Sequence, residues 1–256
     1  MPVPLPSASA RPLRSSGLLP AVACSLALLT AAGPLHAAGG ETKAKTAKTV
    51  PQTMNGLPLI VFEDFESGAD KWEPTDAEAW KIEKEEDGNH VFSQFKKRSN
   101  YNPPFRSPYN RAMLRDVHVG SFVLDARLRS THPDYGHRDL CLFFGQQDES
   151  HLYYVHLGKK MDDHANQIFI VDEAPRTKIS TKTTEGTNWD DEWHHVRIVR
   201  DVKSGSIQVF YDDMKTPVMT AENKAFTWGR VGVGSFDDTG HFDNFALYGE
   251  KVEPKQ

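Results

Sequence analysis

The stretch WHHVRIVRDVKSGSIQVFYDD, residues 193–213, decides the fold class of this chain. Polar and apolar side chains alternate in its first half, so that Val196 and Ile198 would share one face of a strand. The same period of two returns in residues 206–213, after the turn sequence Lys203-Ser204-Gly205, in which glycine can adopt a positive φ. These residues predict two antiparallel strands joined by a tight turn.

Short segments of the same kind recur along most of the chain. The other segments that read as strands are 59–65, 80–84, 90–95, 121–129, 139–145, 152–157, 167–171, 231–236 and 242–248. About a dozen strands, with no helix longer than a turn or two, predict an all-β protein built as a β-sandwich.

The N-terminus has the pattern of a secretory signal. Arg11 and Arg14 precede an apolar run, residues 18–29, and small residues follow it. Residues 1–37 are therefore predicted to be a signal peptide, and the chain to be secreted or periplasmic. The apolar run is too short for a spanning helix of about 20 residues, so we expect no membrane insertion of the mature chain. A lipid anchor on Cys24 is the alternative, although almost no apolar stretch precedes that cysteine.

Residues 38–56 have the Gly, Thr, Lys and Ala composition of a flexible linker, so we expect the folded domain over residues 57–256. Loss of Arg11 and Arg14 with the signal leaves 28 Lys and Arg against 35 Asp and Glu, a formal charge of −7. This balance disfavours a nucleic acid as the partner.

Cys141 would be the only cysteine left, which excludes an intramolecular disulfide, and its leucine neighbours indicate a buried position.

Three stretches resemble the concanavalin A-like lectin/glucanase superfamily, including laminin-G-like modules of secreted bacterial proteins. They are FEDFESGADKW at 62–72, the stretch 193–213, and GRVGVGSFDDTGHFDNFALYG at 229–249. The resemblance covers essentially residues 57–250. It implies a jelly roll of two antiparallel sheets in which the concave sheet forms a groove for a polysaccharide or another glycan.

Histidine, tyrosine and cationic side chains gather between Asp134 and Asn166. In LYYVHL, residues 152–157, the odd-numbered residues make an apolar core face, which leaves Tyr154 and His156 on the opposite face. We expect that opposite face to line the groove, where aromatic rings and fixed polar groups suit a sugar. A hydrogen-bonded structural pair is the alternative interpretation of the two residues.

Glycan binding is the function that these features favour, with polysaccharide cleavage as the first alternative and a structural or protein-interaction role as the second. A lyase needs a cation to neutralise the sugar carboxylate and a Tyr or His to transfer protons. The candidate catalytic residues are Tyr154, His156 and Arg138. The candidate ligand-binding residues are Arg106, Arg111, His137, Lys159, His164 and Gln167. The sequence lacks the Glu-x-Asp-x-x-Glu strand of laminarinase-type hydrolases and the Arg-x-Glu-Leu-Arg and Gln-Ile-His strands typical of jelly-roll alginate lyases.

The segment SNYNPPFRSPYNR, Ser99–Arg111, is predicted to be a loop beside the groove. Its three prolines restrict the backbone, so that Tyr101, Phe105 and Tyr109 would be held ready for a sugar. The alternative is a rigid strand connection whose aromatic side chains pack on the sandwich.

Acidic residues near the chain ends suggest a structural calcium ion. The resemblance brings the first and last strands together, and with them Glu63, Asp64 and Asp243, whose oxygens suit calcium. Solvated acids on edge strands are the alternative. Five histidines between His132 and His164 show neither the His-Glu-x-x-His nor the paired-cysteine spacing of a zinc site, so their spacing does not predict one.

Overall fold

The computed structural model describes residues 48–254, so the predicted signal peptide lies outside the described residues. Residues 48–254 form seventeen strands and one 3-10 turn, Ala77–Ala79. Within this range, no helix has the length and apolar character needed to cross a membrane.

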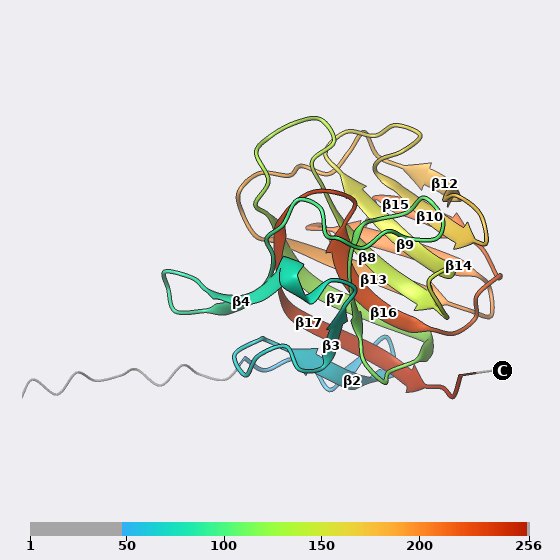
Figure 1. Cartoon of the computed structure of the whole chain (residues 1–256). Coiled ribbons are helices and arrows are strands. Elements are labelled where there is room, and N and C mark those ends of the chain that lie inside the picture. The colour runs from blue at the N-terminus through green and yellow to red at the C-terminus, as the bar shows by residue number, and fades with distance from the viewer. Residues whose placement is uncertain (1–47, 255–256) are drawn as a thin grey trace, which may run out of the picture. The chain divides into compact units, whose positions relative to one another are not determined.

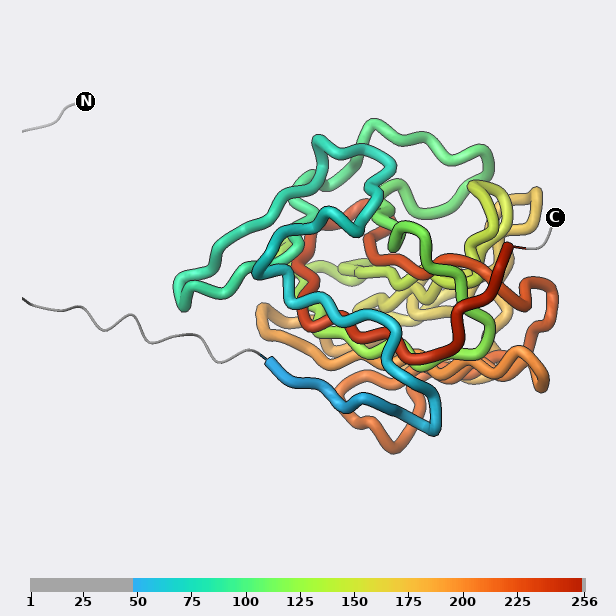
Figure 2. Tube along the Cα trace, turned by 90° about the horizontal axis from the view of Figure 1, so that it is seen from below, coloured from blue at the N-terminus to red at the C-terminus, as the bar shows by residue number. Residues whose placement is uncertain are grey.

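The larger sheet has ten strands, all paired antiparallel, and contains both the first and the last strand. Its main order is β1-β2-β17-β7-β13-β14-β15-β12, while β5 pairs with β17 and β4 with β5. The bounds are β1 Thr53–Met54, β2 Leu57–Glu63, β4 Trp80–Lys84, β5 His90–Gln94, β7 Val119–Ser130, β12 Ser180–Thr183, β13 His194–Asp201, β14 Ser206–Tyr211, β15 Met219–Glu222 and β17 Gly240–Lys251. Figure 2 shows β2 beside β17, at the edge where the described chain begins and ends.

The smaller sheet has seven antiparallel strands in the order β11-β10-β9-β8-β16-β6-β3. The bounds are β3 Trp72–Pro74, β6 Asn110–Leu114, β8 Asp139–Gln146, β9 His151–Gly158, β10 Gln167–Asp172, β11 Thr177–Lys178 and β16 Arg230–Ser235. In Figure 1 this sheet lies in front of the ten-stranded sheet. The predicted two-sheet β-sandwich is confirmed.

The period-two pattern places the core between the sheets. In β7, Leu124 and Leu128 are fully buried there, and in β9 Tyr153, Val155 and Leu157 face them from the seven-stranded sheet. Each side chain of this kind contributes about 1.5–3 kcal/mol through its removal from water. The β13–β14 hairpin forms as the sequence predicts.

Two boundaries differ from the sequence-based expectation. β1 pairs with β2 ahead of Leu57, where the folded domain was expected to begin. β6 begins at Asn110, inside the segment predicted to be a loop, because Ala112 and Leu114 pack into the core while Met113 packs on the other side of the sheet.

Gly234 allows β16 to approach β6 closely. Gly234 is paired in register with Arg111 of β6. A Cβ atom added at Gly234 would lie 1.9 Å from the carbonyl oxygen of Asn110. A side chain at this position would therefore separate two central strands of the seven-stranded sheet.

Candidate functional site

The outer face of the seven-stranded sheet, which points away from the core between the sheets, carries a second apolar cluster. It consists of Met113, Cys141, Phe143, Leu152, Tyr154, Phe169 and Val171. These residues come from β6, β8, β9 and β10, four strands of one sheet. The prediction that Tyr154 faces away from the core is therefore confirmed.

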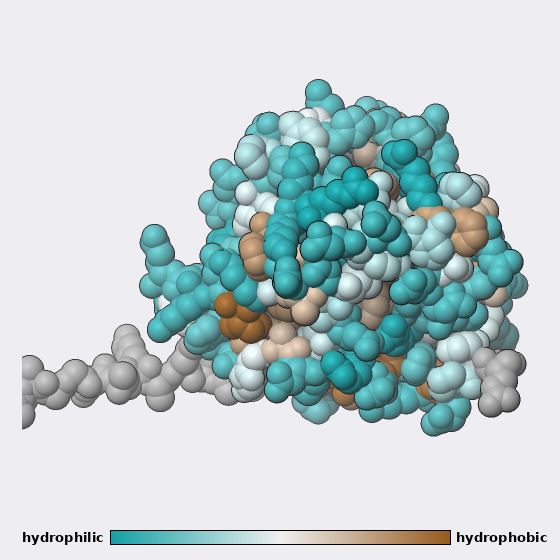
Figure 3. All heavy atoms as spheres, viewed as in Figure 1, coloured by the Kyte–Doolittle hydropathy of each residue, from teal (hydrophilic) through white to brown (hydrophobic). Residues whose placement is uncertain are grey.

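Residues 99–109, called the crossing segment below, run over this outer face (Figure 1). Phe105 packs on the apolar cluster. The amide of Tyr109 donates to the carbonyl of Phe236 at 3.0 Å, and the carbonyl of Arg106 accepts from the amide of Arg176 at 3.1 Å. Seen from the same side, the surface is largely hydrophilic (Figure 3), so the segment conceals the apolar cluster from solvent.

Tyr154 and His156 lie beneath this covering, which corrects the prediction that they line an open groove. Tyr154 is fully buried and His156 is 5% exposed. The Tyr154 ring stacks on Phe169 with centroids 5.1 Å apart, and the His156 ring stacks on Phe236 at 5.9 Å. Burial raises the pKa of Tyr154 and lowers that of His156, so both side chains are neutral.

Arg176 is a residue that the sequence analysis missed. Its guanidinium lies over Phe236 at 4.3 Å and over Phe169 at 4.8 Å, and it donates to the hydroxyl of Tyr154 at 2.9 Å. The signal for it was Pro175-Arg176 in the connection after β10, where a loop arginine can fold back onto the sheet.

Gln167 and two predicted histidines gather around Asp162 at one rim of the outer face. Gln167 is the register partner of His156 and donates to the Asp162 carbonyl at 2.9 Å. The exposed His137 ring lies 3.5 Å from the Asp162 carboxylate, which also accepts from the amide of His164 at 2.6 Å. The positive charges that His137 and His164 can carry help lower the pKa of His156, after burial and Arg176.

Arg138 and Lys159 do not join the other predicted site residues. Arg138 is buried and donates to the hydroxyl and the carbonyl of Ser130, at 2.8 and 2.7 Å, and to Asp191 at 2.9 Å. Lys159 is paired with Asp134. Arg138 immediately precedes Asp139, the first residue of β8, and its guanidinium is turned toward Ser130 instead of the outer face, so the predicted grouping of Arg138 with Tyr154 and His156 is wrong.

An open pocket of about 310 Å³ lies at the other end of the same outer face. It is lined by Glu73, Pro74, Thr75, Tyr101, Arg111, Met113, Gln146, Glu149 and Arg230. This cavity, called the Tyr101 pocket below, combines an aromatic ring with guanidinium, carboxylate and amide groups. Of the predicted ligand-binding residues it contains Arg111. Arg106 lies elsewhere, exposed, with its guanidinium 5.7 Å from the ring centroid of Phe236.

Arg111 is held rigidly at the floor of the pocket. It is 2% exposed, donates from Nε to the Pro108 carbonyl at 3.1 Å and bonds to the hydroxyl of Ser107. Its guanidinium lies 5.3 Å from the ring centroid of Tyr101. Burial lowers the pKa of Arg111, but an arginine stays charged at any physiological pH.

Tyr101 and Arg230 also line the pocket. Burial raises the pKa of Tyr101, Arg111 opposes that rise and Glu149 adds to it. The Tyr101 hydroxyl is buried without an aligned hydrogen-bond partner among the described residues. Arg230 is fixed by Gln146, whose amide oxygen accepts from Nε at 2.8 Å, and by an ion pair with Glu73.

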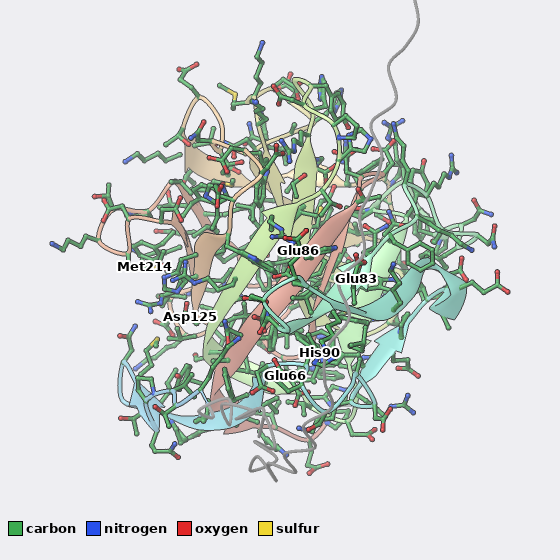
Figure 4. The ribbon with its side chains drawn as sticks, turned by 90° about the vertical axis from the view of Figure 1, so that its left-hand side faces the viewer. Glu66, Glu83, Glu86, His90, Asp125 and Met214 are labelled. Carbon is green, nitrogen blue, oxygen red and sulfur yellow. The ribbon has the colours of Figure 1, made fainter. Side chains whose placement is uncertain are left out.

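The outer face of the ten-stranded sheet also has cavities, and one of about 250 Å³ has Phe62, Tyr248 and Asp125 in its lining. Figure 4 shows Asp125 on this face, and Glu83 and Glu86 on the projecting β4–β5 hairpin. His195 and Arg197 both bind Asp125; their bonds hold its pKa low although burial alone would raise it. The cavity of about 480 Å³ beside the hairpin is lined mainly by acidic and basic residues, together with His241, and its lining contains no Phe, Tyr or Trp.

The residues predicted to hold calcium are each bound to other groups. Glu63 is paired with Lys71, and the Asp64 carboxylate accepts from the amide of Glu66 at 3.3 Å. Asp243 lies 2.9 Å from the ammonium of Lys48. The register pairs Glu63 with Phe245, so the expected approach of the first and last strands is present.

Two other groups of side chains have the composition of metal ligands. Asp139, Cys141 and His156 each offer one donor atom, and these atoms lie within 4.8 Å of one another. Asp139 forms a second such group with Asp237 and Asp238. The described chain thus contains an acidic site, at a place other than the predicted one.

No protein-family model matches the chain, and no curated protein sequence matches it. Solved structures do match. The carbohydrate-binding module CBM66 from Bacillus subtilis has a TM-score of 0.50 and 14% identity, covering 70% of this chain and 95% of the module. The winged bean acidic lectin complexed with methyl-α-D-galactose has a TM-score of 0.51 and 15% identity, covering 75% and 98%.

Domain 4 of AbnA, an extracellular GH43 arabinanase from Geobacillus stearothermophilus, is a third similar structure. Determined in complex with arabinotriose, it has a TM-score of 0.51 and 11% identity, covering 77% of this chain and 94% of that domain. At these identities the similarity concerns the fold: the chain has the concanavalin A-like jelly roll that the sequence resemblance implied.

Proposed function

We propose that this jelly-roll domain binds a glycan, and that the Tyr101 pocket is where it does so. The observation that carries the proposal is the composition of that pocket, an aromatic ring beside two fixed arginines and two carboxylates in a cavity of about 310 Å³. A sugar ring offers an apolar face for stacking and hydroxyls that both donate and accept hydrogen bonds. The Tyr101 hydroxyl, which lies beside Glu149, supplies one such group.

The rigidity of the lining also supports binding. Arg111 is fixed by Ser107 and Pro108, and Arg230 by Gln146 and Glu73, so their guanidinium groups lose little freedom when a ligand arrives. Three similar structures are named as a carbohydrate-binding module, a lectin with a bound galactoside and a domain with bound arabinotriose. The carbohydrates named with these structures belong to the class of ligand that we propose for this chain.

Polysaccharide cleavage by Tyr154, His156 and Arg138 has less support. A proton-transfer group must come within hydrogen-bond reach of the substrate, directly or through one water. Tyr154 is buried in the apolar cluster on which Phe105 packs, His156 is buried against Phe236, and Arg138 is turned toward Ser130. The alternative would need the crossing segment to move away from the sheet.

Affinity electrophoresis through gels that contain dissolved polysaccharides tests the proposal. The wild-type protein should be retarded by at least one polysaccharide, and Tyr101→Ala should lose most of that retardation. Phe95→Ala is the matched control, because Phe95 is an exposed aromatic residue, 43% accessible, outside the pocket. Equal retardation of Tyr101→Ala and wild type would exclude this pocket as the glycan site.

Catalysis is tested in the same samples. Elimination would give an unsaturated product and a rise in ultraviolet absorbance, and hydrolysis would give new reducing ends. Incubation with uronate polysaccharides should produce neither signal. A product whose formation requires His156 would instead establish the cleavage alternative.

A structural calcium ion at the meeting of β2 and β17 is a further part of the proposal. Asp243 Oδ2 and Asn89 Oδ1 lie 2.9 and 3.1 Å from the one ammonium nitrogen of Lys48, so oxygen donors already converge on a cation there. Calcium takes six to eight oxygens, so its binding would displace Lys48 and the Lys71 that is paired with Glu63. Addition of calcium to the chelated protein should release or absorb heat in a calorimetric titration and should raise the melting temperature. The absence of both effects would exclude the calcium site.

Export fits the same function, because polysaccharides are met outside the cytoplasm. It rests on the signal pattern in residues 1–37, which lies outside the described residues. N-terminal sequencing of protein recovered from a secreting host should begin at Ala38.

A further inference from the structure

We infer that Asp139, Cys141 and His156 form a binding site for a transition-metal ion, with zinc as the ion that the donor set fits best. The three residues come from two paired strands. Asp139 and Cys141 are two residues apart on β8 and so share its outer face, and His156 on β9 is the register partner of Cys141. The inference does not depend on the proposed glycan binding, which uses the other end of that face.

The donor atoms have the spacing of a tetrahedral site. Asp139 Oδ2 lies 3.4 Å from His156 Nε2 and 3.5 Å from Cys141 Sγ. Zinc bonds of about 2.1 Å to oxygen and nitrogen and about 2.3 Å to sulfur place such donors about 3.4–3.6 Å apart around a tetrahedral ion. All three donors lie within 4.8 Å of one another, so the remaining edge must contract by about 1.2 Å or less to reach the tetrahedral spacing.

The imidazole of His156 provides an independent reason to place a ligand here. Both of its ring nitrogens are buried and neither has a hydrogen-bond partner. The contact with Asp139 lacks the alignment of a hydrogen bond, although it is only 3.4 Å long. A buried imidazole normally satisfies its N–H and its lone pair, and a metal ion bound to the lone pair beside the thiol and the carboxylate would account for one of the two unpaired nitrogens.

The surroundings fit a cation. The Asp139 carboxylate also accepts from the amide of Phe236 at 2.8 Å, which fixes the orientation that it needs as a ligand. Asp237 and Asp238 add carboxylates within 4.8 Å of Asp139 and offset the nearby positive charge of Arg176. Thiolate, imidazole and carboxylate together select zinc or cobalt over calcium or magnesium. Three protein ligands leave a fourth position for water.

The test is binding of zinc and cobalt to the purified full chain in a Cys24→Ser background, in which Cys141 is the only thiol. Loading with zinc chloride, followed by desalting and elemental analysis, should leave about one zinc ion per chain. Cobalt should give the near-ultraviolet charge-transfer band of a cobalt–thiolate bond. Cys141→Ser should remove the band, and Cys141→Ser and His156→Gln should each lower zinc affinity about tenfold or more.

His151→Gln is the matched control. His151 lies on the same strand but is surface-accessible and close to Asp148, Asp172 and Glu173, so it is the place where zinc would bind adventitiously. Its replacement should change neither the zinc content nor the cobalt spectrum.

Several results would overturn the inference: no zinc retained after desalting, a cobalt spectrum without a thiolate band, or loss of zinc in His151→Gln alone. Should His156→Gln or Cys141→Ser fail to fold, the cobalt spectrum of the parent protein decides, because its thiolate band can come from no other residue.

Discussion

The hydroxyl of Tyr154 accepts a hydrogen bond of 2.9 Å from Nη1 of Arg176. This bond joins the buried centre of the seven-stranded sheet to a loop arginine that reaches it from the β10–β11 connection. Since Arg176 also bonds through its amide to Arg106, the crossing segment, the loop and the sheet form one connected unit.

Tyr154→Phe should therefore destabilise the fold without affecting the Tyr101 pocket. The substitution keeps the ring on Phe169 but leaves the guanidinium of Arg176 without this partner, at a cost of about 1.5 kcal/mol. Urea denaturation measures the change. Retardation by polysaccharide should equal that of the wild type, and a clear loss would place Tyr154 in the binding site.

His156 should make stability depend on pH. Burial lowers its pKa, so the folded state keeps the ring neutral, while the unfolded chain binds a proton near the ordinary histidine pKa of about 6.5. As the pH falls below that value the unfolded state takes up the extra proton, and stability decreases by at most about 1.4 kcal/mol per pH unit.

The comparison of wild type with His156→Gln isolates this contribution from that of other histidines. Urea titrations between pH 7 and pH 5, with a chelator present, should show a steeper loss in the wild type. Parallel pH profiles for the two proteins would contradict a buried, neutral His156.

Arg138→Met should lower stability and leave glycan binding intact. It removes the two hydrogen bonds to Ser130 and leaves those oxygens without a donor in a buried place, which costs about 2–4 kcal/mol. Thermal unfolding and affinity electrophoresis are the measurements. Normal stability combined with lost retardation would restore Arg138 to the binding residues.

Gly234→Ala should prevent close pairing of β16 with β6, because its Cβ atom would lie 1.9 Å from the Asn110 carbonyl. The expected loss is more than about 3 kcal/mol. Gly120→Ala in β7 is the control, since its nearest contact is an ordinary 3.5 Å and its cost should stay below about 1 kcal/mol. Similar stabilities of the two variants would show that the sheet relaxes around the methyl group.

The strand pattern could be predicted because it is local. Alternation alone identifies β7, β13 and β14 and assigns the core face of β9. It fails for β6, whose Ala112 and Met113 are buried on opposite sides of the sheet, so that no alternation is visible. In β8 both faces are apolar for the same reason, so the side taken by Arg138, the residue just before this strand, could not be read from the sequence.

The site could be predicted only in part, because its accessibility depends on chain segments far apart in the sequence. The parity of Tyr154 and His156 was correct, but Tyr154 is covered by Phe105 and Arg176 and His156 by Phe236, which come from separate connections. The cluster of Asp139 and Cys141 with His156 needs the register between β8 and β9, which the sequence does not state.

The crossing segment separates the residues that could set ligand preference from those that build the scaffold. Tyr101 belongs to a connection between β5 and β6 that is anchored at one end by the backbone bond from Tyr109 to Phe236 and at the other by the bond from the Ser99 amide to the Asn110 side chain, so residues 100–102 take part in no strand pairing. Saturation mutagenesis of residues 100–102 would thus vary the lining of the proposed glycan site at little risk to folding, which makes this stretch a natural starting point for directed evolution of the domain.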